Sequence, residues 1–168
     1  GPESRALTHL LLTLGPQYDM ASYDPKKQAV RTETGKTNRL LMRRYATIQK
    51  ARDASVVGLV VGTLGIHAYL PLLKELRRIL TSRASQRKVY TISVGKLNPT
   101  KLANFLEIDV FVLVACPENS LLDTRDFMRP VVTPWEMMLA VQARGGQEVP
   151  WTGAYVLDFA NVMHDASH

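Results

Sequence analysis

The chain has one cysteine in 168 residues, Cys116, and only 7% aromatic residues. A single cysteine excludes an internal disulfide framework and favours a reducing, intracellular setting. The longest apolar runs are too short to span a bilayer, and no signal peptide is visible. Internal repeats and low-complexity stretches are also missing. We therefore expect a cytoplasmic globular protein with no membrane partner.

The charge balance is basic but not extreme. Lys and Arg outnumber Asp and Glu by 21 to 15, a formal net charge of +6. Such a balance permits contact with nucleic acid or an acidic protein without requiring either. The basic residues are spread over several predicted helices, and no RNA-binding aromatic signature accompanies them. The sequence therefore favours a solvated surface and no direct nucleic-acid partner.

Hydrophobic residues make up 46% of the chain, enough for the core of one compact domain. Three apolar runs, at 56–61, 87–94 and 110–115, predict adjacent strands. Helical patterns between them indicate a mainly parallel central sheet of about four strands with helices on both faces. The predicted fold is a single three-layer α/β domain over residues 1–168. Residues 141–168 form a weakly patterned tail.

Other elements are predicted around this sheet. Capping and turn residues place helices at 6–14, 38–54, about 66–81 and 99–105, with Thr37 and Asn98 as caps for the second and fourth. Two short strands at 18–23 and 28–32 flank a turn at Tyr23-Asp24-Pro25. Thr133-Pro134 predicts the start of a further helix.

Cys116 follows directly on the strand predicted at 110–115. Pro117 cannot extend the hydrogen-bonded ladder, so the thiol is placed at the carboxyl end of a parallel strand. Ligands of open α/β sheets gather in the crevice beyond those ends. The alternative is a buried structural cysteine that acts as a small hydrophobe.

The turn Gly62-Thr63-Leu64-Gly65 joins another buried strand to a helix at the same predicted edge. Its glycines let the backbone approach a ligand, and the helix N-terminus favours anions. The alternative is a tight strand-to-helix turn without a ligand.

Several familiar sites are excluded by spacing. Thr34-Gly35-Lys36-Thr37 lacks the earlier glycine of a phosphate-binding loop, since Val30 occupies that position. A phosphatase loop needs Arg where Leu122 stands, and no G-x-G-x-x-G follows a strand, which disfavours a Rossmann-like methyltransferase. One cysteine and four scattered histidines give no zinc spacing or protease dyad. Cys116 can still be one ligand of a metal cluster whose other thiolates lie outside this chain.

Several segments together resemble one family, the diphthamide-synthesis family, and in particular its third, C-terminal domain. Residues 116–123 point to the second subunit of the eukaryotic heterodimer. The segments that carry the resemblance are 22–25, 41–45, 61–65, 101–105, 109–117 and 129–136.

The resemblance implies a specific chemistry. The family transfers the 3-amino-3-carboxypropyl group of S-adenosylmethionine to a histidine of translation elongation factor 2, the first step of diphthamide formation. A 4Fe-4S cluster, held by one cysteine from each of three similar domains, cleaves the sulfonium to give an aminocarboxypropyl radical. Cys116 matches the third of these cysteines, and Gly62, Thr63, Leu64 and Gly65 match the cofactor-binding turn.

The sequence departs from the catalytic paralogue directly after this turn. The paralogue carries Arg-Gln-Gly there, whereas this chain has Ile66-His67-Ala68. The departure fits a subunit that supports its catalytic partner by helping to keep the partner's cluster reduced, with an accessory iron protein as electron donor. We expect the chain to be the last third of a longer subunit and inactive by itself. The alternative from another class is a non-catalytic interaction domain for subunit pairing.

Overall fold

The computed structural model describes residues 21–32, 34–63, 65–95, 98–114 and 127–144. The helix predicted at 6–14 lies outside these residues. In chain order the described elements are β1 (Ala21–Asp24), β2 (Ala29–Thr32), α2 (Thr34–Asp53), β3 (Val56–Gly62), α3 (Ile66–Thr81), β4 (Lys88–Val94), α4 (Pro99–Ala103), β5 (Val110–Val114), β6 (Val131–Val132) and α5 (Pro134–Arg144).

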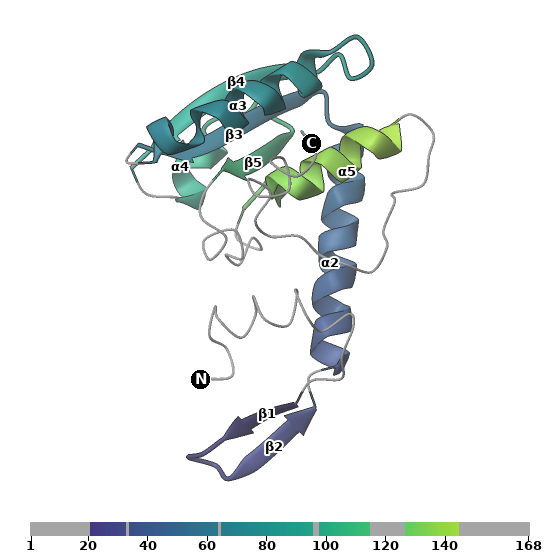
Figure 1. Cartoon of the computed structure of the whole chain (residues 1–168), viewed down its shortest axis with the longest axis vertical. Coiled ribbons are helices and arrows are strands. Elements are labelled where there is room, and N and C mark those ends of the chain that lie inside the picture. The colour runs from purple at the N-terminus through teal and green to yellow at the C-terminus, as the bar shows by residue number, and fades with distance from the viewer. Residues whose placement is uncertain (1–20, 33, 64, 96–97, 115–126, 145–168) are drawn as a thin grey trace.

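Four of the described strands form a parallel sheet in the order β4-β3-β5-β6 (Figure 1). The three predicted strands are adjacent, and β5 is an inner strand, so the α/β fold class is confirmed. β3 and β5 are buried almost throughout, which explains why both read as continuous apolar runs without alternation. Asp109 Oδ2 accepts the backbone N–H groups of Ser55 and Val56, both at 3.0 Å, and so aligns the starts of β3 and β5.

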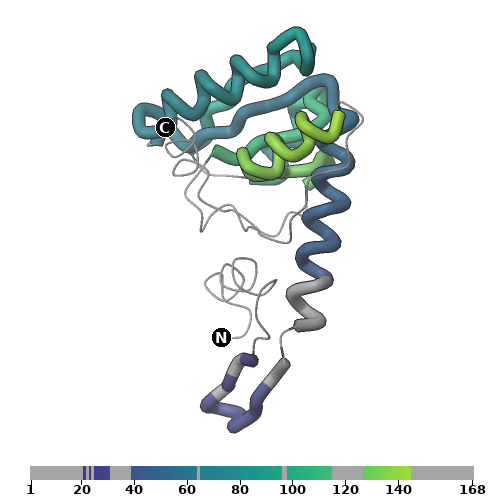
Figure 2. Tube along the Cα trace, turned by 45° about the vertical axis from the view of Figure 1, so that its right-hand side comes forward, coloured from purple at the N-terminus to yellow at the C-terminus, as the bar shows by residue number. Residues whose placement is uncertain are grey.

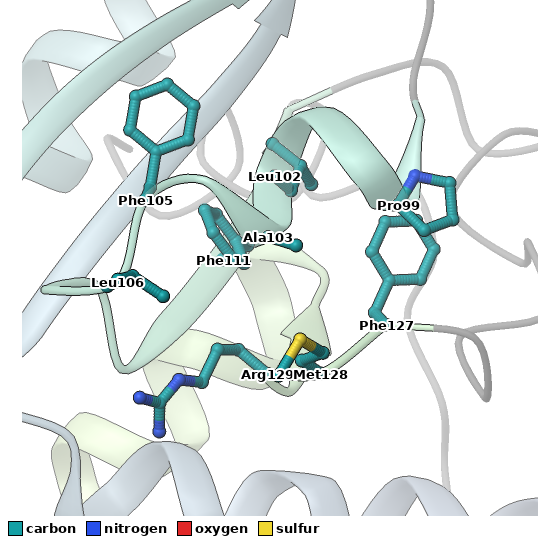
Figure 3. Close-up of a pocket in the computed structure, with 9 residues that line it drawn as sticks. All are labelled: Pro99, Leu102, Ala103, Phe105, Leu106, Phe111, Phe127, Met128 and Arg129. Carbon is teal, nitrogen blue, oxygen red and sulfur yellow. The ribbon is translucent and has the colours of Figure 1, made fainter.

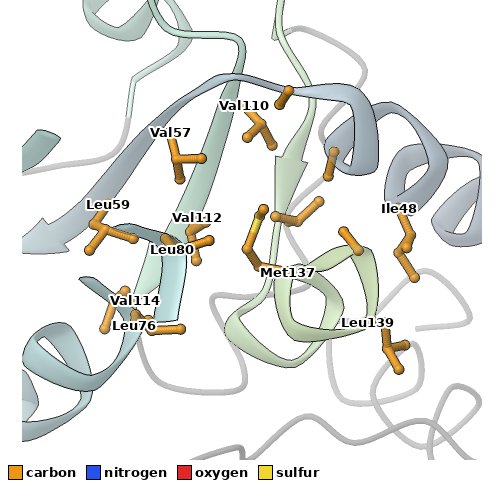
Figure 4. Close-up of a cluster of buried hydrophobic side chains, with 14 of the residues drawn as sticks. Ile48, Val57, Leu59, Leu76, Leu80, Val110, Val112, Val114, Met137 and Leu139 are labelled. Atoms are coloured by element: carbon orange, nitrogen blue, oxygen red, sulfur yellow. The ribbon is translucent and has the colours of Figure 1, made fainter. Parts of the chain in front are cut away.

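The two faces of the sheet are covered unequally. Leu59 and Val112 point to a core shared with α2, α3 and α5, whose buried side chains include Ile48, Leu76 and Met137 (Figure 4). On the opposite face, the side chains of the sheet form a second buried cluster, to which the five-residue helix α4 contributes Leu102. Helices therefore lie on both faces, as predicted, but those on the first face are much longer.

β1 and β2 pair antiparallel as a separate hairpin in which Tyr23 lies opposite Val30. Figures 1 and 2 show the hairpin at the end of α2 that is remote from the parallel sheet. The second half of α2 packs on α5 and β6. Among the α2 side chains that the structure describes, Ile48 and Ala51 of this half belong to the core.

The start predicted for α2 is wrong. The helix begins at Thr34, so Thr37 lies inside the first turn and is not its N-cap. The residue before the helix is Glu33, which is not among the preferred N-cap residues, so no capping signal in the sequence marked the true start. Residues 34–37 are helical, in agreement with the rejection of a phosphate-binding loop there.

Helices α4 and α5 begin where their predicted caps place them. Asn98 Oδ1 accepts the backbone N–H of Thr100 at 2.9 Å. At α5, Thr133 Oγ1 accepts from the N–H of Glu136 at 3.2 Å, and Glu136 Oε1 accepts from the N–H of Thr133 at 2.8 Å. This reciprocal pair is a capping box. α5 continues to Arg144 and so enters the segment 141–168 that was expected to be weakly patterned.

Glu136 is also held by a residue of α2. Arg44 Nε donates to Glu136 Oε2 at 2.7 Å and Arg44 Nη2 to Oε1 at 2.6 Å. The same Nη2 donates to the carbonyl of Val131 in β6 at 2.8 Å. Glu136 is fully buried. The pair therefore fixes α2, β6 and α5 to one another through a carboxylate that water does not reach.

Two arginines donate hydrogen bonds to backbone carbonyl groups around the carboxyl end of α2. Arg87 is buried and donates to the carbonyls of Ala54 and Arg52, at 3.1 and 2.9 Å, and Arg144 donates to the carbonyl of Ser85 at 3.2 Å. Burial, and secondarily the charge of Arg144, lowers the pKa of Arg87 to about 10. The carbonyls at a helix C-terminus carry partial negative charge, which favours a guanidinium there despite its desolvation.

Candidate functional site

The carboxyl ends of β3 and β5 meet at the position where the strand order reverses. β3 is followed by β4 on one side, whereas β5 lies on its other side. The connecting helices α3 and α4 pack on opposite faces. In open α/β sheets such a reversal marks the edge where ligands bind. The ends of β3 and β5 are therefore the candidate ligand site of this sheet.

The turn after β3 is closed by backbone hydrogen bonds. Thr63 N donates to the carbonyl of Val94 at 3.0 Å, and Gly65 N to the carbonyl of Gly62 at 3.0 Å. Leu64 lies outside the described residues. A Cβ on Gly65 would come within 3.3 Å of the Tyr69 ring, whereas one on Gly62 would meet nothing nearer than 4.0 Å. A side chain at position 65 would therefore require the Tyr69 ring to shift slightly, whereas the backbone at Gly62 has open space beside it.

α3 starts directly at this turn. Its N-cap is Gly65, which has no side chain to bond the first backbone N–H groups, and its first turn carries no acidic residue. His67 in that turn is exposed. The positive end of the helix dipole thus lies at the carboxyl edge of the sheet, an arrangement that suits a carboxylate or phosphate.

Cys116 lies outside the described residues, so the structure does not test its position. β5 ends at Val114, which is paired with Val61 of β3. The strand that precedes the cysteine thus ends beside the turn at Gly62. Among the described residues, no group of three or more His, Cys, Asp or Glu side chains could hold a metal ion. A cluster at this edge would therefore need thiolates from Cys116 and from outside the described chain.

A different hollow lies on the α4 face of the sheet (Figure 3). Its empty volume is about 350 Å³ with the open space at its mouth included. It contains neither Gly62 nor Thr63, and Arg129 is its only charged residue. The lining residues are Pro99, Leu102, Ala103, Phe105, Leu106, Phe111, Phe127, Met128 and Arg129. This apolar lining has no group for acid–base or metal chemistry.

The ion pair between Arg44 and Glu136 was not found from the sequence. Glu136 three residues after Thr133 is a recognisable capping signal, but its cationic partner stands 92 residues earlier. The two side chains belong to segments 41–45 and 129–136, so two of the segments that carried the family resemblance are in direct contact. In the described part of the chain, no helix is both long and apolar enough to cross a membrane.

Comparisons with known proteins agree on one family. The model of the family described as "Putative diphthamide synthesis protein" matches residues 1–156. The chain is 48% identical over 166 residues to 2-(3-amino-3-carboxypropyl)histidine synthase subunit 2 of Gallus gallus, covering 99% of this chain and 33% of that protein. It is 42% identical over 167 residues to the protein of the same name from Schizosaccharomyces pombe, covering 97% and 31%. The chain thus spans about a third of the length of these relatives.

Solved structures show the same fold. The crystal structure of Dph2 from Pyrococcus horikoshii with a 4Fe-4S cluster matches with a TM-score of 0.59 and 25% identity. The match covers 84% of this chain and 39% of that one. A second crystal structure of Dph2 from Pyrococcus horikoshii matches with a TM-score of 0.61 at 24% identity, covering 89% and 39%.

Proposed function

This chain belongs to the diphthamide synthesis protein family, and on that premise we propose that it is the third domain of a subunit 2 of 2-(3-amino-3-carboxypropyl)histidine synthase. The observation that carries the proposal is the family match over residues 1–156, supported by relatives that bear this name. The complete subunit would pair with a paralogous catalytic subunit and act in the first step of diphthamide formation.

The proposed reaction moves the 3-amino-3-carboxypropyl group of S-adenosylmethionine to a histidine of elongation factor 2. A 4Fe-4S cluster, which the Pyrococcus horikoshii neighbour holds according to its description, would supply the electron that cleaves the sulfonium. Cys116 would provide one of three thiolates, the other two coming from preceding domains. Several thiolates hold such a cluster, so this chain by itself cannot retain one.

The turn of Gly62, Thr63, Leu64 and Gly65 would hold the carboxylate end of S-adenosylmethionine. The open backbone at Gly62 and the uncapped start of α3 support this role. Ile66 and His67 occupy the positions where the catalytic paralogue has Arg and Gln, so we propose that this subunit binds the cofactor weakly. Its role is then to support the partner's cluster, with an accessory iron protein delivering electrons.

The decisive experiment is Cys116→Ala in the full-length subunit, with Ser93→Ala as the control. Ser93 is an exposed residue of β4, next to the carboxyl end of that strand. Its replacement by alanine removes one polar atom but no thiolate that could bind a cluster. We expect the cysteine variant to lose most of its iron and its paramagnetic cluster signal, while the control keeps both. A complete cluster in Cys116→Ala would contradict the proposal and favour a structural cysteine.

The alternative is a non-catalytic interaction domain that serves subunit pairing and has no redox role. Calorimetric titration of the full-length subunit with S-adenosylmethionine and iron analysis separate the two. A subunit that pairs with its partner but holds no iron supports the interaction module. Tight binding of S-adenosylmethionine by the isolated chain would instead show that Ile66-His67-Ala68 does not weaken the turn.

A further inference from the structure

Exposed apolar side chains gather on one face of the parallel sheet, the face on which α4 packs. Among the described residues from 56 to 144, the exposed large hydrophobic side chains are Leu70, Tyr90, Phe105, Leu106 and Met128. Phe105, Leu106 and Met128 line the apolar hollow of this α4 face (Figure 3). Tyr90 is paired in register with Gly58, which faces the same buried cluster, so Tyr90 points to that face as well.

The backbone holds Leu106 in its exposed position. Phe105 N donates to the carbonyl of Leu102 at 3.1 Å, and Ile108 N donates to the carbonyl of Phe105 at 3.2 Å. Leu102 and Ile108 are buried, so the turn is anchored on both sides of Leu106. The Leu106 side chain is nevertheless 73% exposed. It cannot turn into the core without breaking this anchored turn.

The opposite wall of the hollow is held in a similar way. The carbonyl of Pro130 accepts from Phe111 N at 2.9 Å, and Phe127 packs against the buried cluster of this face. Met128 lies between these two anchors and is 80% exposed. The apolar surface is therefore preformed, and docking on it would cost little ordering of the chain.

This face also has little helical cover among the described residues. Both faces of a parallel sheet are normally buried by the helices that connect its strands. Helices α2, α3 and α5, with 20, 16 and 11 residues, contribute to the core on the other face. On the α4 face the helical contribution is Leu102 of a five-residue helix. A large exposed apolar patch beside so short a helix is typical of an interaction site.

We propose that Phe105, Leu106 and Met128, called the α4-face patch here, pack against an apolar surface in the remaining part of the same polypeptide. The proposal rests on the proposed function, in which this chain is one domain of a longer subunit. The chain covers 33% and 31% of two relatives, so about two thirds of each of those proteins lies outside the matched region. That length is enough for further domains of the same size.

Two physical arguments favour the same polypeptide over a separate partner. A linked domain reaches the patch at an effective concentration of roughly millimolar order, which a separate protein must exceed to compete. A patch reserved for a separate partner would also stay open in the lone subunit, and soluble monomers rarely expose such surfaces. Of the described residues that line the hollow, Arg129 alone is charged, so the lining has few of the charges that select a separate partner.

Site-specific photo-crosslinking of the full-length subunit tests this occupant. The crosslinking amino acid p-benzoylphenylalanine is introduced at position 106 or 128, and at position 70 as the control, because Leu70 is exposed on α3, which packs on the other face. The subunit is irradiated alone and again after the other subunit is added. Mass spectrometry then identifies the crosslinked residues, and two tag sizes reveal crosslinks between copies.

We expect positions 106 and 128 to crosslink in the lone subunit to residues of the same polypeptide outside these 168, and position 70 not to do so. Crosslinks to the other subunit or to a second copy in place of these would overturn the proposal. The absence of any crosslink from positions 106 and 128 would overturn it as well, since the patch would then face solvent.

A matched pair of variants gives a second readout. Leu106→Gln and Leu70→Gln make the same chemical change at two exposed leucines. If another part of the polypeptide covers the patch, Leu106→Gln weakens that packing. A protease should then cleave the linker between these 168 residues and the rest of the subunit several-fold faster, whereas Leu70→Gln should behave as the wild type does. Circular dichroism verifies that both variants are folded. Equal cleavage rates in the two variants would contradict the proposal.

The same preparations separate this proposal from the proposed function. Iron content and pairing with the other subunit are measured on the wild-type protein. A subunit that shows the expected internal crosslinks but neither holds iron nor pairs would support the α4-face contact and contradict the proposed function. A subunit that holds iron and pairs, but shows no internal crosslink from positions 106 and 128, would overturn the α4-face contact alone.

Discussion

At the scale of the residue, the contact between Arg44 and Glu136 shows how one ion pair can hold three elements. Glu136 is fully buried, but both of its oxygens accept charge-assisted bonds from Arg44, and Oε1 also accepts the backbone N–H of Thr133. A buried pair adds little stability compared with an apolar substitute. Removing only one partner of the pair nevertheless destabilises the protein strongly, because the charge of the other partner stays buried.

Arg44→Met should destabilise the protein by about 3–5 kcal/mol, the range seen when one partner of a buried pair is removed. Arg43→Met, one residue earlier on the exposed side of α2, is the matched control and should change stability by less than about 0.5 kcal/mol. Urea unfolding followed by circular dichroism measures both. The double variant Arg44→Met/Glu136→Gln should recover part of the loss, and failure to do so would show that the pair is not the cause.

Cys116 illustrates what residue-level sequence reasoning can and cannot provide. Its position after an apolar strand and before a proline predicted the end of β5, and β5 indeed ends at Val114. Because the chain has a single cysteine, the further thiolates that a cluster needs would lie outside these 168 residues, and no pattern within them could define the whole site. The role of Cys116 as a ligand therefore stays a prediction from the family resemblance.

At the scale of the element, β3 shows why a central strand can need glycine. Gly58 points to the α4 face, and a Cβ there would lie 2.9 Å from Ile108 Cδ1 and 3.1 Å from Phe111 Cδ1. The small residue lets these two larger side chains pack against the sheet. Gly58 and Gly62 face the same side of the sheet but have different roles. Gly58 makes room for the packed core, whereas Gly62 lies beside the candidate site at the end of the strand.

Gly58→Ala should destabilise the protein by about 1–3 kcal/mol, as overpacking in a filled core does. Gly62→Ala is the control in the same strand, because its Cβ would meet nothing nearer than 4.0 Å. Thermal unfolding compares the two variants. Adding Ile108→Val removes the atom nearest to the new methyl group and should restore part of the stability of Gly58→Ala. If Gly62→Ala lost as much stability as Gly58→Ala, replacing a strand glycine would itself cause the loss, and crowding would not be the explanation.

Long and strongly patterned elements were predictable, and short ones formed by tertiary contacts were not. The inner strands and α3 carried enough apolar periodicity to be located within one or two residues. β6 has two residues between Pro130 and Thr133, and it forms because β5 offers a free edge. The early start of α2 was missed because Glu33, which precedes its first residue, is not a preferred cap, whereas Thr37 is.

At the scale of the whole molecule, the described chain divides into a packed body and a projecting hairpin, β1–β2, which the first half of α2 joins to it. Among the described residues, hydrophobic burial is concentrated in the sheet and in the helices around it, from Ile48 onwards. The sequence predicted the body because a core leaves an apolar periodicity along the chain. It did not reveal that the hairpin stands apart from the sheet, because their separation appears only in three dimensions.

This division predicts a gradient of local stability in the isolated chain, which native-state hydrogen exchange can measure. Amides of β3 and β5 should exchange slowest, through global unfolding, because these inner strands are paired on both sides and almost fully buried. Amides of β1 and β2 should exchange at rates near those of an unfolded peptide, since the hairpin pairs only with itself and exposes Tyr23 and Val30. Within α2, protection should rise from the first turns towards Ile48 and Ala51, where the helix enters the core. Equal protection of hairpin and sheet would mean that the hairpin folds cooperatively with the body and would contradict this division.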